Sequence, residues 1–376
     1  MRIAFYAPLK PPDHPVASGD RSMARALIGA LERGGHDVNL ASHFRSYDAG
    51  DARRQARLRE EGRKLAHRLL RKIERGGAAP DLWVTYHLYH KAPDWLGSVV
   101  TARLGIPYVV VEASYAPKQE DGRWALGHRA VVEAVRRAAL ILQPNPIDAE
   151  CVLPLLDDPE RMKALRPFID TAPFRVPDRG QSRAAIGAMA GLDDRLPWLL
   201  TVAMMREDQK LLSYQILADA MTRLRGERWQ LVIAGAGPAE EKVREAFGSF
   251  GERVHWAGVI APDVLKRLYR AADLYLWPAV KEAFGMSLIE AQAAGLPVVA
   301  GRSGGIPSIV VDGETGLLTP EGDTGAFAAA VASLLRDEKR RFAMGKAAMD
   351  FAERHLDIEA ASKFLDKELR TLVLAR

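Results

Sequence analysis

Two glutamates in the second half of the chain, Glu282 and Glu290, lie on either side of a Phe284–Gly285 pair. The apolar run "LYLWP" precedes them and the run "PVVA" follows. Ligands of parallel sheets bind beyond the carboxyl ends of strands, so the loop after "LYLWP" is placed to contact one. A carboxylate at Glu290 could accept two hydrogen bonds from vicinal hydroxyls, as on a ribose, and Glu282 could bind another polyol or stabilise positive charge. The simpler interpretation is a surface helix with two ordinary glutamates.

The residues between the glutamates predict a helix that begins near Gly285 and ends at Gly295, because glycine often follows the last helical turn. The first backbone N–H groups of a helix have no partner within it, and here they belong to Phe284, Gly285, Met286 and Ser287. A helix start of this kind favours anions, so it is suited to a diphosphate or to sugar hydroxyls. Glycine at 285 would let a ligand approach the backbone closely.

Residues 278–300 read P-x-x-x-E-x-F-G-x-x-x-x-E-A-x-x-x-G-x-P-V-V-A. This pattern resembles the paired-glutamate signature of the family 4 (group 1) retaining glycosyltransferases, which have the GT-B fold. The resemblance implies that Glu282 orients and stabilises the donor sugar and that Glu290 holds the ribose. It also implies front-face substitution, in which the leaving phosphate itself takes the acceptor proton.

The resemblance continues outside this stretch. "VHWAGVIAPDVLKRLYRAADLYLWP" is similar to the family's base-binding loop, which implies that Gly258 and Val259 present backbone groups to the nucleotide base. "GRSGGIPSIVVDGETGLLTPEGD" is similar to a later loop, although Ser308 stands where a glutamate is common. "GDRSMARALIGALERGGHDVNLA" looks like the first helix of the acceptor domain, and its leading glycine loop, Ser18–Asp20 with Gly19, faces the interdomain cleft in that family.

A departing diphosphate must be neutralised by a metal ion or by fixed cations and dipoles. Relatives use an Arg and a Lys after the first strand of the second domain, where this chain reads "TVAMMREDQKLLSY". Arg206 and Lys210 fit this role, since both side chains bind phosphate oxygens, although Met204 occupies the usual arginine position. The alternative is a pair of surface charges. No Asp-x-Asp and no zinc-like His/Cys spacing is present, so we expect no metal and no cofactor besides the nucleotide-diphosphate sugar donor.

The first half departs from the family at one position. Many relatives place a histidine near the donor sugar after the strand that matches "YVVVEAS", where this chain has Glu112 and Ser114. Two histidines, His87 and His90, end the preceding strand. Strand ends border ligand sites in such sheets, so His87 or Glu112 could take the catalytic role, and a packed strand-end histidine is the equal alternative.

Strand-like and helix-like segments alternate along the whole chain. Strand candidates run from "RIAFYAP" to "MKALRPF" in the first half and from "WLLTVA" to "GLLT" in the second, with helical patterns between them at 19–33, 93–104 and 124–137. This alternation predicts an α/β fold with two Rossmann-like doubly wound parallel sheets. The resemblance adds the GT-B arrangement, in which the two domains face a central cleft.

A stretch rich in Pro, Gly and Asp interrupts the periodicity near Pro177–Pro197. We therefore expect an acceptor-side domain at 1–180 and a donor-binding domain at 195–355. The last helix, at about 358–376, is expected to cross back to the first domain.

The bulk composition limits the classes of partner. The 376 residues carry a net charge of +5 and a single cysteine, Cys151, which favours anionic partners and a reducing compartment. No apolar run approaches the ~18 residues that a membrane span needs, so we expect a cytoplasmic protein. Nucleic acid is the least expected partner, because the positive charge is concentrated in one helix and no basic strand with interleaved aromatics is present.

Residues 52–75 predict a basic amphipathic helix with ten Lys/Arg and three Glu. Leu58, Leu65, Leu69 and Ile73 recur at helical spacing. The favoured interpretation is a solvated helix that rests its apolar stripe on the sheet; the other is peripheral contact with anionic lipid at the inner face of the membrane.

The leading functional hypothesis is a retaining glycosyltransferase that moves a sugar from a nucleotide-diphosphate sugar to a hydroxyl on a carbohydrate or lipid-linked acceptor. Polysaccharide, lipopolysaccharide or glycolipid assembly is the expected setting. The alternatives are a nucleotide-sugar epimerase or phosphorylase on the same scaffold, or a non-catalytic nucleotide-sugar-binding partner, because a fold alone does not choose among them.

Overall fold

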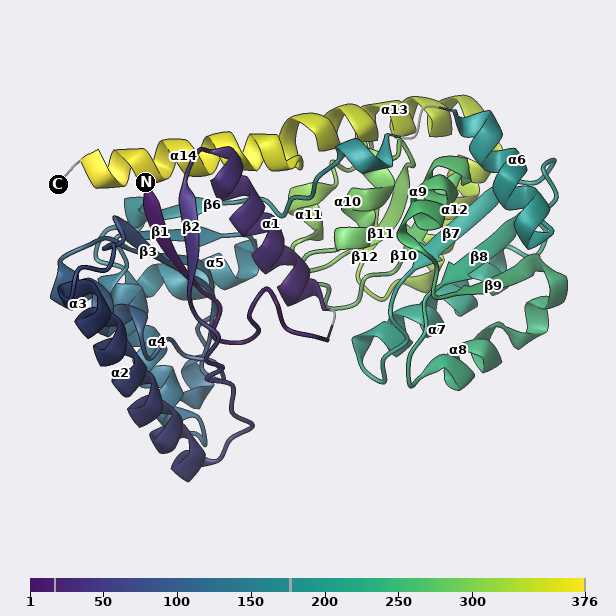
Figure 1. Ribbon diagram of the computed structural model, residues 1–376. Coiled ribbons are helices and arrows are strands. Elements are labelled where there is room, and N and C mark those ends of the chain that lie inside the picture. The colour runs from purple at the N-terminus through teal and green to yellow at the C-terminus, as the bar shows by residue number, and fades with distance from the viewer. Residues whose placement is uncertain (17, 176–177, 375–376) are drawn as a thin grey trace. The chain divides into compact units, whose positions relative to one another are not determined.

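The computed structural model describes residues 1–16, 18–175 and 178–374 (Figure 1). The chain forms two compact units, each built around its own parallel sheet. The predicted α/β fold with two Rossmann-like doubly wound sheets is confirmed.

Unit 1 consists of Met1–Arg166 and Ile358–Arg376, and unit 2 of Pro167–Asp357. The division differs from the expected break at 177–197, whose first residue, Pro177, lies outside the described residues. The segment after Arg166 belongs to unit 2 because it bonds to the end of that unit. Ile169 N donates to the Leu356 carbonyl at 3.0 Å, and Thr171 N donates to the Asp357 carboxylate at 3.1 Å.

The sheet of unit 1 has six parallel strands in the order β2-β1-β3-β4-β5-β6. The two central strands, β3 and β4, are almost entirely buried, as expected for parallel strands covered by helices on both faces. The order reverses direction between β1 and β3, which in doubly wound sheets is where ligands bind. The strands are β1 (Arg2–Tyr6), β2 (Asp37–Ser42), β3 (Leu82–Leu88), β4 (Tyr108–Ala113), β5 (Leu140–Gln143) and β6 (Met162–Ala164).

The last helix of the chain packs in unit 1, side by side with the first (Figure 1). Arg33 Nε bonds to Glu359 at 3.1 Å, and His36 Nε2 lies 3.2 Å from Asp366. The helices of unit 1 are α1 (Gly19–Arg33), α2 (Ala52–Glu74), α3 (Gly97–Leu104), α4 (Ala125–Arg137), α5 (Pro146–Val152) and α14 (Ile358–Leu374).

Two sequence predictions in unit 1 were too long. The run "MKALRPF" forms only the short strand β6, which ends at Ala164. The helix expected from residue 93 begins at Gly97, after the N-cap residue Leu96. The Asp94 carboxylate holds the turn before it by accepting from Leu96 N at 2.8 Å and from Gly97 N at 2.7 Å.

The sheet of unit 2 has six parallel strands in the order β12-β11-β10-β7-β8-β9, and its direction reverses between β7 and β10. The strands are β7 (Trp198–Val202), β8 (Gln230–Ala234), β9 (Val254–Gly258), β10 (Leu274–Trp277), β11 (Val298–Arg302) and β12 (Gly316–Pro320). The helices are α6 (Arg179–Ala190), α7 (Gln209–Arg223), α8 (Glu240–Phe247), α9 (Pro262–Ala271), α10 (Met286–Ala293), α11 (Ile306–Ile309), α12 (Thr324–Arg336) and α13 (Glu338–His355). Short 3₁₀ turns complete the two units at Pro117–Gln119, Leu153–Leu155, Pro159–Arg161, Ala172–Phe174 and Gly248–Arg253.

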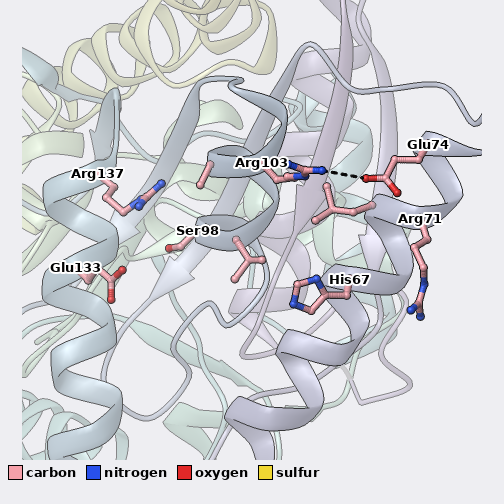
Figure 2. A pocket seen from close by; sticks show the side chains of 10 residues that line it. His67, Arg71, Glu74, Ser98, Arg103, Glu133 and Arg137 are labelled. Carbon is pink, nitrogen blue, oxygen red and sulfur yellow. Dashed lines mark ion pairs between the residues drawn. The ribbon is translucent and has the colours of Figure 1, made fainter.

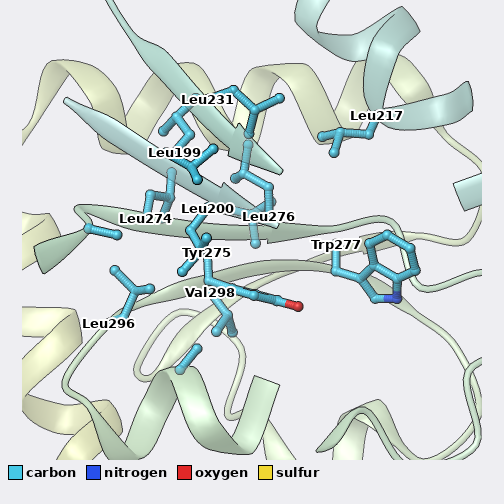
Figure 3. Close-up of a cluster of buried hydrophobic side chains, with 14 of the residues drawn as sticks. Leu199, Leu200, Leu217, Leu231, Leu274, Tyr275, Leu276, Trp277, Leu296 and Val298 are labelled. Carbon is cyan, nitrogen blue, oxygen red and sulfur yellow. The ribbon is translucent and has the colours of Figure 1, made fainter. Parts of the chain in front are cut away.

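The core of unit 2 surrounds the two strands on either side of the reversal. Figure 3 shows Leu199 and Leu200 of β7 close to Leu274 and Tyr275 of β10, all at most 1% exposed. Burying each such side chain contributes roughly 1.5–3 kcal/mol. The carboxyl ends of β7 and β10 are thereby fixed, and the loops that follow them start from a rigid edge.

Candidate functional site

Glu282 and Lys210 form an ion pair at the carboxyl edge of the unit 2 sheet. Glu282 lies in the loop after β10, and Lys210 lies in the first turn of α7, which follows β7. Trp277 Nε1 donates to the same Glu282 oxygen at 3.1 Å, and the Lys210 ammonium lies 5.1 Å from the centre of the Trp277 ring. The pair therefore stands where the strand order reverses, the position at which a doubly wound sheet binds its ligand.

The loop that carries Glu282 has a strained backbone. Ala279 and Lys281 have φ angles of 56° and 46°, in the left-handed region that non-glycine residues rarely adopt. Each such residue costs roughly 1–3 kcal/mol and persists only where the surroundings hold it. The loop is therefore held in one conformation by its neighbours rather than by its own preference.

Three glycines, Gly301 near the end of β11 and Gly304 and Gly305 directly after it, supply that support. A Cβ at Gly301 would overlap the Pro278 carbonyl oxygen, and a Cβ at Gly304 would overlap that of Glu282. Gly305 N–H donates to the Ala283 carbonyl oxygen at 3.1 Å, and a Cβ at Gly305 would overlap the same oxygen. The sequence run "GRSGG" thus allows two backbone segments to approach closely and fixes the position of Glu282.

Glu290 lies four residues into α10 and is held by a neighbouring helix. The buried Tyr269 hydroxyl of α9 donates to Glu290 Oε2 at 2.8 Å. Burial raises the pKa of Glu290, and the Tyr269 hydrogen bond opposes that rise. Glu290 therefore combines a protein hydrogen bond with the capacity to accept another from a ligand.

The start of α10 has the predicted form. Gly285 precedes its first residue, Met286, and adopts φ 63°. A Cβ at Gly285 would lie 2.5 Å from Ile306 Cδ1, so both the backbone angle and the space require glycine. Ser287 is held in place by the Tyr275 hydroxyl at 2.7 Å, and Phe284 in the preceding loop is half-buried.

The other residues expected to contact the donor are more exposed. Arg206 extends into solvent and contacts the Met204 sulfur at 3.2 Å rather than the Lys210–Glu282 pair. Gly258 ends β9 with φ 60°, and Val259 after it is 85% exposed. Their backbone groups lie at the carboxyl edge of the sheet, as the base-binding prediction requires, and the roles of these residues stay predictions.

A second cluster lies at the carboxyl edge of the unit 1 sheet. His87 lies near the end of β3, Glu112 near the end of β4, and Asp20 in the first turn of α1. His87 Nδ1 lies 2.9 Å from Asp20 Oδ1 and 3.6 Å from Glu112 Oε1. The two residues proposed as alternatives, His87 and Glu112, are therefore neighbours in one cluster.

The cluster combines backbone strain with shifted proton affinities. His87 and Glu112 have φ angles of 59° and 62°, again in the left-handed region. Burial raises the pKa of Glu112 to about 7, although the His87 charge opposes the rise. For His87, burial disfavours the imidazolium, but the Glu112 charge and the Asp20 hydrogen bond outweigh it and raise the pKa to about 9.

The remaining residues singled out near this edge do not join the cluster. His90 packs against Trp124 with ring centres 5.4 Å apart, and burial lowers its pKa to about 4. Gly19 begins α1, and a Cβ there would meet open space, so its contact with the donor stays a prediction. The residue of this first turn that contacts His87 is its neighbour Asp20. Sequence reasoning missed Asp20; the available signal was an acidic residue in the first turn of a helix after a strand.

Comparison with known proteins finds a family model that matches part of unit 2. Residues 197–337 match the family model described as glycosyl transferases group 1. A D-inositol 3-phosphate glycosyltransferase of Mycobacterium sp. (strain KMS) is 34% identical over 220 residues, which are 56% of this chain and 47% of that protein. One from Acidothermus cellulolyticus is 29% identical over 277 residues, 68% of this chain and 60% of that protein. The chain spans about half the length of the curated relatives that it matches.

Solved structures match the fold over the whole chain. Sucrose-phosphate synthase from Thermosynechococcus elongatus has a TM-score of 0.74 and 22% identity and covers 100% of both chains. Anabaena HepE in complex with UDP has a TM-score of 0.73 and 18% identity, covering 99% of this chain and 100% of that one. The chain therefore has the GT-B fold, and its residues 197–337 match the group 1 glycosyltransferases.

Proposed function

We propose that the protein is a retaining, family 4 glycosyltransferase that moves a sugar from a nucleotide-diphosphate sugar to a hydroxyl acceptor. The observation that carries this proposal is the Lys210–Glu282 pair beside the start of α10, at the reversal of the unit 2 sheet. A cation, a carboxylate and a helix N-terminus together provide partners for a diphosphate and for a sugar in one place.

In the proposed mechanism, the Lys210 ammonium and the first N–H groups of α10 stabilise the departing diphosphate, and Arg206 approaches it from solvent. Glu290 accepts from the ribose hydroxyls, and Glu282 orients the sugar. The leaving phosphate takes the acceptor proton as the new glycosidic bond forms on the same face. Fixed cations and a helix dipole supply the positive charge, so we propose that no metal is required and that EDTA leaves the rate unchanged.

UDP-glucose is the first donor to test, because Anabaena HepE has been solved with it. D-inositol 3-phosphate, named for the curated relatives, belongs in a panel with lipid-linked, polysaccharide and lipopolysaccharide acceptors. Product formation with retained anomeric configuration by NMR supports the proposal, and an inverted product refutes a retaining mechanism. Incubation with donor alone separates an epimerase, which would convert it to another sugar nucleotide. If the protein binds the donor but transfers its sugar to none of the acceptors in the panel, the result would support a non-catalytic nucleotide-sugar-binding protein.

We further propose that the protein acts in the cytoplasm and that α2 contacts an anionic membrane surface. All of its Lys and Arg side chains except Arg59 are exposed, while Gly62 packs on Trp95 and Leu70 is buried. A pocket of about 730 Å³ lies beside α2, and His67 and Arg71 of this helix line part of it. Figure 2 shows the side chains around it. Within the described residues, none of the helices has the length and apolar character to cross a bilayer.

Sedimentation with vesicles tests the membrane contact. The wild type should sediment with vesicles that contain anionic lipid and not with neutral ones, and high salt should release it. Reversing Arg63, Lys64 and Arg68 to Glu should abolish sedimentation. Equal behaviour of the two proteins would show that α2 is only a solvated helix of unit 1, anchored by Leu58 and Leu65, which pack against the core.

A further inference from the structure

Asp20, His87 and Glu112 come together from three different elements of unit 1. They meet where the strand order reverses between β1 and β3, so unit 1 has a polar cluster at the same topological position as the Lys210–Glu282 pair of unit 2. The register fixes this meeting, because Tyr86 pairs with Val111 and Leu88 with Ala113 on either side of the two strained residues.

The two ring nitrogens of His87 have different surroundings. Nδ1 faces both carboxylates, at 2.9 Å from Asp20 and 3.6 Å from Glu112. A carboxylate that accepts from Nδ1–H fixes the orientation of the ring. Nε2 is then the nitrogen left for a ligand, on a side chain that is 18% exposed.

Resting on the function proposed above, we propose that Asp20 is a positioning residue that holds His87 through Nδ1, beside Glu112, so that Nε2 donates a hydrogen bond to a neutral hydroxyl group of the sugar substrates. His87 is the group that contacts the substrate, and Asp20 acts through it.

The charges around the ring determine the class of ligand. Carboxyl groups outnumber the cations that act on the cluster, so a phosphate or carboxylate would be repelled where a hydroxyl is not. A buried imidazolium between two carboxylates is a hydrogen-bond donor over the neutral pH range rather than a base. The titratable and charged groups around His87 are Asp20 on α1, Tyr86 on β3, Tyr89 after β3, Glu112 on β4 and Asp148 on α5, with Lys10 acting on Asp20.

A purely structural contact is the competing explanation, since the Asp20–His87 bond also ties α1 to the sheet. The two explanations differ in what Asp20→Asn changes. If the contact is only structural, Asp20→Asn lowers the melting temperature and, because a carboxylate 2.9 Å away is lost, the His87 pKa, but the folded variant keeps the wild-type KM and kcat. If Asp20 positions His87 for the substrate, transfer by the folded variant also falls and its alkaline limit moves to lower pH, and Asp20→Glu restores both at least in part.

The test measures the His87 pKa by NMR on protein with labelled histidine, with the His87 signal assigned through His87→Gln. Asp20→Asn should weaken proton binding by His87 about tenfold, which is about one pKa unit. Transfer should fall, and the loss of activity at alkaline pH should begin about one pH unit lower. Asp13→Asn is the matched control, because Asp13 pairs with the exposed His43 at 2.9 Å in the same unit and should leave the His87 pKa unchanged.

An Asp20→Asn variant that folds with the wild-type His87 pKa and pH profile would overturn the proposal. So would an Asp20→Glu variant that fails to restore the shift. The same NMR sample tests positioning without transfer. Saturating UDP-glucose should shift the His87 signal of the wild type and not that of Asp20→Asn, and equal responses of the two proteins would count against the positioning role. A wild type without activity but with the expected NMR shift would count against the proposed function alone.

Discussion

The ammonium of Lys210 donates to the carboxylate of Glu282 across the reversal of the unit 2 sheet, from α7 to the loop after β10. Each partner neutralises the other while no ligand is bound. A nucleotide diphosphate would compete with Glu282 for Lys210, because phosphate oxygens are equally good partners for an ammonium. Donor binding would then free the Glu282 carboxylate for the sugar. The same change of partner would thus place Lys210 on the diphosphate and make Glu282 available to the sugar.

Lys210→Gln is expected to weaken UDP binding by about 10- to 100-fold, since a hydrogen bond to a charged group contributes roughly 1.5–3 kcal/mol. Titration calorimetry measures it. Lys242→Gln is the matched control, because it removes the same charge from the same unit where Lys242 pairs with Glu207 at 2.7 Å on the surface. Equal affinities of the two variants would remove Lys210 from the donor site.

Glu290→Gln should stabilise the protein at neutral pH while weakening UDP binding about tenfold, because a neutral amide accepts a weaker hydrogen bond from ribose. Burial raises the pKa of Glu290, so its stabilising contribution is lost as pH rises from the ordinary glutamate value through the higher folded value. The amide can still accept from Tyr269. Urea unfolding across this pH range should show a gap between variant and wild type that widens with pH; a constant gap would contradict the buried-charge argument.

The sequence predicted helix bounds well where residues within or beside the helix determine them. The periodicity of 19–33 predicted α1 to the residue, and Phe284–Gly285 marked the start of α10. Both signals lie within the element itself, because helix starts and apolar stripes are local properties.

Contacts between distant segments were not predictable in the same way. Asp20 and His87 are 67 residues apart, and their meeting depends on which strand lies beside β1. The "GRSGG" run was recognised as a loop, but its support of Glu282 depends on the neighbouring positions of β10 and β11. A single sequence does not state the order of the strands in a sheet. The residues that contact His87 and support Glu282 were therefore harder to predict than His87 and Glu282 themselves.

Gly304→Ala is expected to destabilise unit 2 by about 2–4 kcal/mol and to reduce transfer, because the new Cβ would overlap the Glu282 carbonyl oxygen. Gly304 also has φ 50°, which alone costs alanine about 1 kcal/mol. Gly322→Ala separates the two effects, since Gly322 has φ 80° and a Cβ there meets open space. Thermal unfolding and transfer rates should show the larger loss at Gly304; equal losses would mean that the loop does not depend on this contact.

The stability of the protein should fall between pH 7 and pH 9, and His87 should account for part of that fall. The pKa of His87 is raised to about 9 from an ordinary 6.5, so its contribution is fully present below pH 6.5 and is lost as pH rises through 9. Glu112, with a pKa raised to about 7, loses its own contribution earlier, as pH rises from 4.5 to 7.

The two contributions are separable because their pH ranges differ. Across pH 7–9, the free energy of unfolding of wild type should fall by about 1–2 kcal/mol more than that of His87→Gln, measured in urea at fixed ionic strength. His43→Gln, which breaks an exposed Asp–His pair instead, should follow the wild-type curve. Parallel curves for His87→Gln and wild type would show that the imidazolium is not stabilised by Asp20 and Glu112, and the cluster would then be held by packing alone.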